Sequence, residues 1–507
     1  MDSDLDDVRF RPSARAWNRV GATGIACAVA ALLLTTIARA AEAPTASALQ
    51  AAITNQHPPA LTWQGDTGIT IEVVISIDSR RISGRCHAGR RVVIQDGTST
   101  STADCHDGRY TARMPAGADE GLVATQVLLN GNIAATRVDK LRTSPAGQRI
   151  PPAELGKALA SARPGDRIAV EAGTYADTTI NLSESRGSAD RPVIIDGNNA
   201  VAFTGATRIQ IGAGHVVLRG FTFRDVGIGA ITITGPAVRI TESNFSNCGD
   251  PQKPQAECVI VRAGGKNAEL DFNTFTGSRS MSINVHAGND GEQGQPVNAF
   301  IHHNVFRDIP KLSDNGQEPI QIAGPNGGGS NAELKARIEH NLFYRAEGDR
   351  DAVSIKTPGT TLRWNVFRDM DAAPNIRGGR NAVVTDNLLI RTQAIRINGS
   401  DHRVEGNVVL CPSAGIGLVV SHGSPGYETA ANTLIRGNII ATKGAGILFG
   451  AQTQPLESVA HGNKVVSNAF HLPENRPMYE IRPADMASKI KQDNSFTASR
   501  SGPELCS

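Results

Sequence analysis

The 507-residue sequence has almost no net charge and, beyond its first forty residues, no long apolar run. Its 51 lysine and arginine residues are nearly balanced by 49 aspartate and glutamate residues. Because a balanced chain has no global field that attracts a polyanion, the composition argues against a nucleic-acid partner. No stretch after residue 40 is apolar for long enough to cross a bilayer, so we expect no stable membrane insertion of the mature chain. The length allows two or three domains.

Spacings typical of zinc sites are also missing. The chain has no Cys-x-x-Cys motif and no cysteine–histidine cluster, which argues against a structural zinc. Of seven cysteines, Cys27 lies in the N-terminal segment, and the other six form an even number, as expected for disulfides in an exported protein. Six cysteines allow fifteen connectivities. We predict two local disulfides, Cys86–Cys105 and Cys248–Cys258, and a third, Cys411–Cys506, that joins the C-terminal end.

The first forty residues have the three parts of a secretory signal. Basic residues come first, an apolar run follows from residue 20 to 37, and Ala38-Arg39-Ala40 gives a small-x-small cleavage site. The basic residues are Arg9, Arg11, Arg15 and Arg19. We therefore predict a signal peptide over 1–40 and a secreted or periplasmic mature protein. The alternative is a single membrane anchor, because the run approaches spanning length.

Residues 41–145 are predicted to form a small β-sandwich of the immunoglobulin-like type. Between about 61 and 141, short runs of alternating apolar and polar residues are separated by turn residues, without a helical period. Cys86–Cys105 would join neighbouring strands of this unit. Nothing in it carries catalytic chemistry, so it either spaces the rest of the chain from a surface or binds glycan.

Residues 146–455 are predicted to form a right-handed parallel β-helix, with its last coil and a C-terminal cap in 456–507. Apolar residues at helical spacing over 152–162 predict a helix that covers the N-terminal end of the stack. After residue 192, short strands carry a repeated Asn-x-apolar mark at intervals of 31, 37, 24, 22, 20, 31 and 30 residues, a variable period typical of coils with loops. A propeller would need longer strands and a more regular period. The marked residues are Asn273, Asn304, Asn341, Asn365, Asn387, Asn407, Asn438 and Asn468.

A lysine and an arginine occupy equivalent places in this repeat. Lys356 and Arg377 are 21 residues apart (377 − 356), about one coil, so their Cα atoms should lie about 4.8 Å apart on neighbouring strands. The preceding residues Ile355, Ile376 and Ile397 keep the same interval, and with Leu418 they should stack inside. A neighbouring arginine lowers the pKa of a lysine, and a lysine with a lowered pKa can act as a base near neutral pH.

Acidic residues precede this pair. Asp349 and Asp351 should lie on the corner before the strand that ends at Lys356. One coil earlier, Asn315 and Glu318 occupy similar positions in Asn315-Gly-Gln-Glu318. Three or four oxygen ligands that converge from two coils predict a calcium site.

These motifs resemble those of the family-six polysaccharide lyases, which include alginate lyases and chondroitinase B. The resemblance rests on Asp349-Arg-Asp351-Ala-Val-Ser-Ile-Lys356, on Asn375-Ile-Arg377-Gly-Gly, and on the upstream segment that begins at Asn315. It extends from about residue 150 to 450. The family usually has glutamates at the positions of Asp349 and Asp351, and a histidine at the position of Gly378.

The resemblance implies β-elimination in a uronate-containing polysaccharide. Lys356 would be the base, Arg377 would act as or support the acid, and Asn315, Asp349 and Asp351 would bind Ca²⁺. The further substrate-binding residues implied are Glu318, Asn375, Arg380, Arg396 and His402. We expect a monomer that acts on an anionic polysaccharide, with alginate as the first choice.

Other functions remain open at this point. A dermatan sulfate lyase like chondroitinase B is the nearest alternative. A glycoside hydrolase or epimerase on the same fold would need aspartates that converge on one coil face without calcium. A β-helix that binds glycan without catalysis is the third, and Gly378 gives it some support.

Overall fold

The computed structural model describes residues 43–506 except 64–67, 76–78, 97–98, 116–121, 139–148, 251, 253–255, 287–297, 325–328, 330, 452–453, 501 and 503. The predicted signal peptide lies outside the described residues. Among those described, no helix combines the length and apolar character needed to cross a membrane.

The N-terminal part contains one helix and two small sheets. Helix α2 (Ala46–Thr54), which the sequence analysis did not predict, begins after Thr45, whose side chain accepts a hydrogen bond from the backbone nitrogen of Ala48 at 3.2 Å. The first sheet has the order β1-β8-β7-β4-β5 and the second has the order β2-β3-β6. The strands are β1 (Leu61–Trp63), β2 (Glu72–Ile75), β3 (Ser79–Arg85), β4 (Arg91–Asp96), β5 (Ser99–Asp104), β6 (Arg109–Pro115), β7 (Leu122–Val127) and β8 (Ile133–Val138).

These two sheets share an apolar core that includes Ile82, Val92 and Tyr110. Pairings are antiparallel except for β1 with β8. The disulfide Cys86–Cys105 joins the residues that directly follow β3 and β5, so it links one sheet to the other. The predicted two-sheet β unit is thus confirmed. The other two predicted disulfides, Cys248–Cys258 and Cys411–Cys506, are also present.

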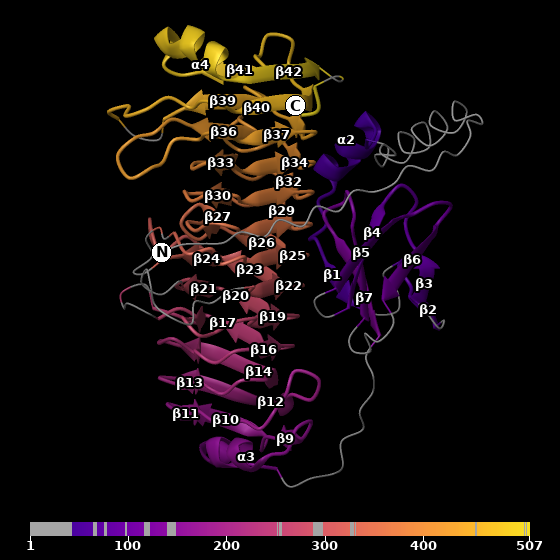
Figure 1. Ribbon diagram of the computed structural model, residues 1–507, viewed down its shortest axis with the longest axis vertical. Coiled ribbons are helices and arrows are strands. Elements are labelled where there is room, and N and C mark those ends of the chain that lie inside the picture. The colour runs from indigo at the N-terminus through magenta and orange to yellow at the C-terminus, as the bar shows by residue number, and fades with distance from the viewer. Residues whose placement is uncertain are drawn as a thin grey trace, which may run out of the picture. The chain divides into compact units, whose positions relative to one another are not determined.

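From β9 onward the chain forms a parallel β-helix, as predicted (Figure 1). Within the described residues, one sheet contains 22 strands and the other 12, and every pairing in both is parallel between successive coils. The larger sheet contains β9 (Arg167–Ala169), β10 (Gly173–Ala176), β12 (Val193–Gly205), β14 (Val216–Val226), β16 (Val238–Thr241), β17 (Asn244–Ser246), β19 (Glu269–Asp271), β20 (Thr274–Thr276), β22 (Phe300–His302), β23 (Val305–Ile309), β25 (Arg337–Glu339), β26 (Leu342–Ala346), β28 (Thr361–Arg363), β29 (Val366–Arg368), β31 (Val383–Thr385), β32 (Leu388–Ile390), β34 (Arg403–Glu405), β35 (Val408–Leu410), β37 (Leu434–Arg436), β38 (Ile439–Ala441), β40 (Lys464–His471) and β42 (Ser495–Arg500). The smaller sheet contains β11 (Thr179–Leu182), β13 (Arg208–Ile211), β15 (Ile231–Ile233), β18 (Val259–Val261), β21 (Ile283–His286), β24 (Ile320–Ala323), β27 (Asp351–Ile355), β30 (Ala373–Ile376), β33 (Ile395–Ile397), β36 (Leu418–Ser421), β39 (Ile447–Gly450) and β41 (Tyr479–Ile481).

Short helices lie at both ends of the stack. The 3₁₀ turn η1 (Pro152–Glu154) leads into α3 (Leu155–Ser161), where Leu155 and Leu159 are buried against the first coils. Figure 1 shows α3 at one end of the coils and α4 (Ala487–Asp493), preceded by η3 (Ala484–Met486), at the other. The predicted N-terminal capping helix is confirmed, and it covers apolar core that an open end would expose to water.

An uninterrupted ladder of asparagines marks one corner of the coils. Each side-chain nitrogen donates to the side-chain oxygen of the asparagine on the next coil at 2.9–3.1 Å, from Asn273 through to Asn468. The asparagine marks of the sequence therefore stack on successive coils. The residue before each asparagine adopts the left-handed backbone conformation: Phe272, His303, His340, Trp364, Asp386, Gly406, Gly437 and Ser467.

The core of the β-helix is built from apolar ladders. Ile355, Ile376 and Ile397 stack in register, fully buried, as the 21-residue interval predicts. Leu418 is also buried, but it pairs with Ile395, and Val420 is the residue that pairs with Ile397. The coil between these strands is two residues longer than the interval, so the predicted register of Leu418 was wrong by two residues.

Candidate active site

Four neighbouring strands of the 12-stranded sheet place polar side chains side by side on their outer face. Gln321, Ser354, Asn375 and Arg396 lie in register on β24, β27, β30 and β33. Strand residues alternate between the two faces, so the apolar residues beside them point into the core. The outer face of these coils is therefore a polar wall.

Lys356 and Arg377 extend this wall at the ends of β27 and β30. The backbone nitrogen of Arg377 donates to the carbonyl of Ile355 at 2.7 Å, which continues the pairing of Ile355 with Ile376. Parallel pairing therefore places the lysine and the arginine at equivalent positions on successive coils, as their 21-residue separation predicts.

Asp351 reaches the same face through a β-bulge. It is the first residue of β27, in place of the corner that the sequence analysis expected, and the pairing with β30 shifts register between Asp351 and Val353. The extra residue reverses the alternation, so Asp351 faces outward. Its side-chain oxygens accept from Asn375 Nδ2 at 2.8 Å and Arg377 Nη1 at 3.2 Å. Asn375 is thus a support for Asp351 within the wall.

Three carboxylates converge beside Lys356. The ligand oxygens of Glu318, Asp349 and Asp351 all lie within 4.8 Å of one another. Gly316 donates its backbone nitrogen to Asp349 at 3.0 Å, and Gln321 Nε2 donates to Glu318 Oε1 at 2.7 Å. Burial, together with Glu318 and Asp351, raises the pKa of Asp349 to about 7, and burial also raises the pKa of Glu318. Acids crowded in this way are stabilised by a shared cation.

Lys356 is half-buried next to this group. Its Nζ atom lies 3.9 Å from Glu318 Oε1. Burial lowers the pKa of Lys356, Glu318 opposes that effect, and Arg377 lowers the pKa further. The effect of Arg377 on this pKa is the one expected from the sequence, and burial is the larger cause. A lysine of this kind is available as a base at lower pH than an exposed one.

Arg377 is held from two sides. Asp351 accepts from Nη1, and Tyr427 lies on the other side, with its ring centre 5.0 Å from Cζ and its hydroxyl 3.5 Å from Nη2. Burial alone would lower the pKa of Arg377, but Asp351 and Tyr427 outweigh it and the pKa is raised. Arg377 therefore stays protonated.

Two cavities flank the wall. One of about 530 Å³ opens beyond the Lys356–Arg377 pair, and its lining includes Lys356, Arg377, Gly378, Tyr427, Glu428 and Glu457. The other, of about 190 Å³, lies toward the start of the strands, and its lining includes Arg350, Asp351, Asn375 and Arg396. Tyr427 and Glu428 were not predicted from the sequence, because they lie in the loop between β36 and β37 and carry no repeat mark.

The remaining predicted residues lie farther from the pair. Asn315 is exposed, immediately before the Gly316 that binds Asp349. Arg380 is exposed at the end of this wall. His402 is buried, with Nδ1 accepting from the backbone nitrogen of Ala382 at 3.0 Å and Nε2 facing the carbonyl of Asn398 at 3.0 Å. Both ring nitrogens are used by the backbone, so His402 supports the fold at this position.

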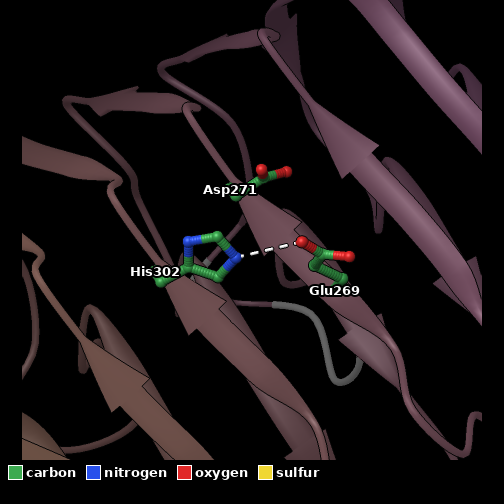
Figure 2. A group of neighbouring side chains, drawn as sticks. All are labelled: Glu269, Asp271 and His302. Atoms are coloured by element: carbon green, nitrogen blue, oxygen red, sulfur yellow. Dashed lines mark hydrogen bonds and ion pairs between the residues drawn. The ribbon is translucent and has the colours of Figure 1, made fainter. Parts of the chain in front are cut away.

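A second acidic group lies on the larger sheet (Figure 2). Figure 2 shows His302 bound to Glu269, with Nε2 and Oε1 at 3.1 Å, beside Asp271. Arg239 Nε donates to Asp271 at 2.9 Å and lies 3.6 Å from Glu269. Although burial opposes it, Arg239 together with His302 lowers the pKa of Glu269 to about 2. Because arginine already balances these acids, this group has less need of a cation than the one beside Lys356.

Known proteins resemble this chain over much of the β-helix. A family model described as chondroitinase B matches residues 151–411. No curated protein sequence matches the chain. A mannuronic acid specific family-six lyase from human gut microbiota has a TM-score of 0.60 and 22% identity, over 70% of this chain and 86% of that one. A family-six lyase from Pseudopedobacter saltans has a TM-score of 0.56 and 20% identity, over 70% and 92%. A family-six alginate lyase in complex with a trisaccharide has a TM-score of 0.52 and 18% identity, over 71% and 91%.

At these identities the solved structures show only that the fold is shared. The assignment to a family rests on the family model. It covers more than half of the 507 residues and contains Lys356, Arg377 and all three converging carboxylates. The chain belongs to the chondroitinase B family, the family-six polysaccharide lyases.

Proposed function

We propose that this protein is a secreted, monomeric, calcium-dependent lyase that cleaves a uronate-containing polysaccharide by β-elimination, with alginate as its first candidate substrate. The observation that carries the proposal is the placement of Lys356 and Arg377 on successive coils against three converging carboxylates. Export is supported by three disulfides, which persist in oxidising compartments.

Lys356 is the base in this proposal. Its neutral amine removes the proton from C5 of the uronate, the electron pair forms the C4–C5 double bond, and the bond between C4 and the bridging oxygen breaks. The lowered pKa of Lys356 increases the neutral fraction that can accept the proton.

Arg377 assists the leaving group. Its raised pKa keeps the guanidinium charged, and Asp351 and Tyr427 fix the plane of its donors. The guanidinium donates hydrogen bonds to the departing oxygen as negative charge develops there, and that oxygen takes its proton from the arginine or from water.

The acidic group has the donor chemistry that calcium prefers. Oxygen ligands of Glu318, Asp349 and Asp351 converge, and among the described residues Glu318 Oε2 is buried without a hydrogen-bond partner. Asn315 could add an amide oxygen from the adjacent loop. When bound, calcium would neutralise the substrate carboxylate and make the C5 proton more acidic.

The test is the ultraviolet absorbance of unsaturated uronate product formed by the mature chain. The substrates are alginate, polymannuronate, polyguluronate and dermatan sulfate, each with calcium and with a chelator. We expect product from at least one polymer, with Lys356→Ala reducing the rate by about 10²–10⁴-fold. Lys443→Ala, which changes an exposed lysine, is the matched control.

The outcomes separate the parts of the proposal. Product that survives the chelator would exclude the calcium role and leave the base in place. Product that survives Lys356→Ala would exclude Lys356 as the base. The absence of product from every polymer, with a folded protein, would favour glycan binding without catalysis.

A further inference from the structure

Two glutamates line the large cavity beyond Arg377. Glu428 and Glu457 line it together with Lys356 and Arg377. Both glutamates are exposed. Within the described part of the chain, neither carboxylate forms an ion pair, so both keep their charge available to whatever enters the cavity.

The loop that carries Glu428 is held firmly. Ser424 and Tyr427 exchange backbone hydrogen bonds at 3.2 and 2.8 Å, which closes a tight turn directly before Glu428. The buried side chain of Asn398 then donates to the carbonyl of Glu428 at 2.9 Å. Since Asn398 follows β33, one coil after Arg377, the loop is fastened to the same wall as the catalytic pair.

Gly378 leaves room for the Glu428 carboxylate. A Cβ atom at residue 378 would lie 2.9 Å from Glu428 Oε1 and 3.2 Å from its Cδ. Any side chain there would have to displace the carboxylate. The absence of a side chain at residue 378 therefore lets the Glu428 carboxylate lie beside the backbone that follows Arg377, at the edge of the cavity.

The opposite side of the wall carries the other sign. The charged residues that line the cavity of about 190 Å³ are Arg350, Arg396 and Asp351, and Asp351 is already paired with Arg377. A polymer that crosses both cavities meets arginines on one side of the Lys356–Arg377 pair and glutamates on the other. An anionic group is attracted on the first side and repelled on the second, where like charges meet at close range.

We propose that Glu428 is a specificity-determining residue that excludes carboxylate and sulfate groups from the large cavity. The sugar bound there, next to the uronate that is cleaved, presents hydroxyl groups, which donate hydrogen bonds to the Glu428 carboxylate. This inference rests on the proposed lyase function. It narrows the substrate to polymers whose sugar in the large cavity turns an uncharged face toward Glu428.

The experiment compares a charged polymer with a neutralised form of the same backbone. The polymers are alginate with its partially carboxyl-reduced form, and dermatan sulfate with its desulfated form, and the measure is kcat/KM per remaining uronate. The wild-type chain should prefer the neutralised form of the polymer that it cleaves. Glu428→Gln should reduce that preference by about tenfold at low salt, and the reduction should shrink at high ionic strength.

Two variants control for shape and for net charge. Glu428→Asp keeps the carboxylate and should keep the preference. Glu474→Gln removes one exposed negative charge elsewhere and should leave the preference unchanged. If Glu428→Gln cleaves both forms in the same ratio as the wild-type chain, or if the wild-type chain prefers the charged form, the inference is overturned. If no polymer yields product, the proposed lyase function fails, and that result is distinct from an unchanged ratio.

Discussion

The guanidinium of Arg377 stacks on Tyr427, with Cζ 5.0 Å from the ring centre and Nη2 within 3.5 Å of the hydroxyl. The two residues are 50 positions apart and lie on different coils, so the contact depends on the loop between β36 and β37. Asp351 holds the other edge of the same guanidinium. The orientation of Arg377 therefore has one support from the coil and one from a loop.

Replacing Tyr427 should reveal what this second support contributes. Because a cation over an aromatic face is stabilised mainly by the ring, Tyr427→Ala should lower kcat/KM by about tenfold and Tyr427→Phe by less than about threefold. The measurement is the initial rate of unsaturated product. Equal losses in both variants would show that the hydroxyl acts directly, as a proton donor to the leaving oxygen.

Calcium should stabilise the fold through the acids beside Lys356. A ligand that binds only the folded state at 100 times its Kd adds about 2.7 kcal/mol to the free energy of unfolding. We expect calcium to raise the thermal midpoint of the wild-type chain, and Asp349→Asn to remove most of this effect, because it removes one ligand charge.

The second acidic group offers the matched control for this prediction. Glu269→Gln changes an acid that is paired with Arg239, so the calcium-dependent rise should persist in that variant. A rise that is lost in Glu269→Gln and kept in Asp349→Asn would move the calcium site to the larger sheet.

His402 should make the protein less stable in acid. Burial lowers its pKa from 6.5 to about 4 in the folded chain, so the unfolded chain takes up the proton first. The stabilising effect of the neutral ring is complete above pH 6.5 and is lost as the pH falls toward 4, by about 3 kcal/mol in total. Urea unfolding at a series of pH values measures this. The difference between the wild-type chain and His402→Asn should shrink over that range, and a constant difference would contradict the prediction.

Removing one member of the asparagine ladder should be costly. Asn365 donates to the carbonyls of Ile338 and Arg363 and to Asn387, and it accepts from Asn341, all in the buried interior. Asn365→Ala leaves several of these groups unsatisfied and should lower the free energy of unfolding by about 3 kcal/mol or more.

An asparagine pair on the surface provides the comparison for that change. Asn298 donates to Asn267 at 3.2 Å in an exposed position, and Asn298→Ala should change stability by less than about 0.5 kcal/mol. Similar losses in the two variants would mean that the buried ladder contributes no more than a surface contact.

Features that repeat along the sequence could be predicted from it, and features that occur once could not. The asparagine marks and the isoleucine interval predicted the coils and the neighbouring positions of Lys356 and Arg377, because parallel pairing converts a sequence interval into a spatial neighbour. The bulge that turns Asp351 outward has no signature of its own, and the coil that carries Leu418 is longer than the interval.

The loop residues that line the large cavity could not be predicted for the same reason. Tyr427 and Glu428 lie in a loop whose path depends on contacts with Asn398 and Gly378, and no spacing in the sequence encodes these contacts. Helix α2 was also missed, since it is short and precedes the alternating strands.

Because Lys356 and Arg377 follow directly paired residues of adjacent coils, their separation is set by the backbone repeat and is independent of the loops. Glu428, which we propose to select the substrate, lies in a loop that can lengthen, shorten or change sequence without altering this separation. The architecture thus lets substrate preference diverge in evolution while the reaction is inherited unchanged, and it marks the segment between β36 and β37 as the place to engineer a new preference.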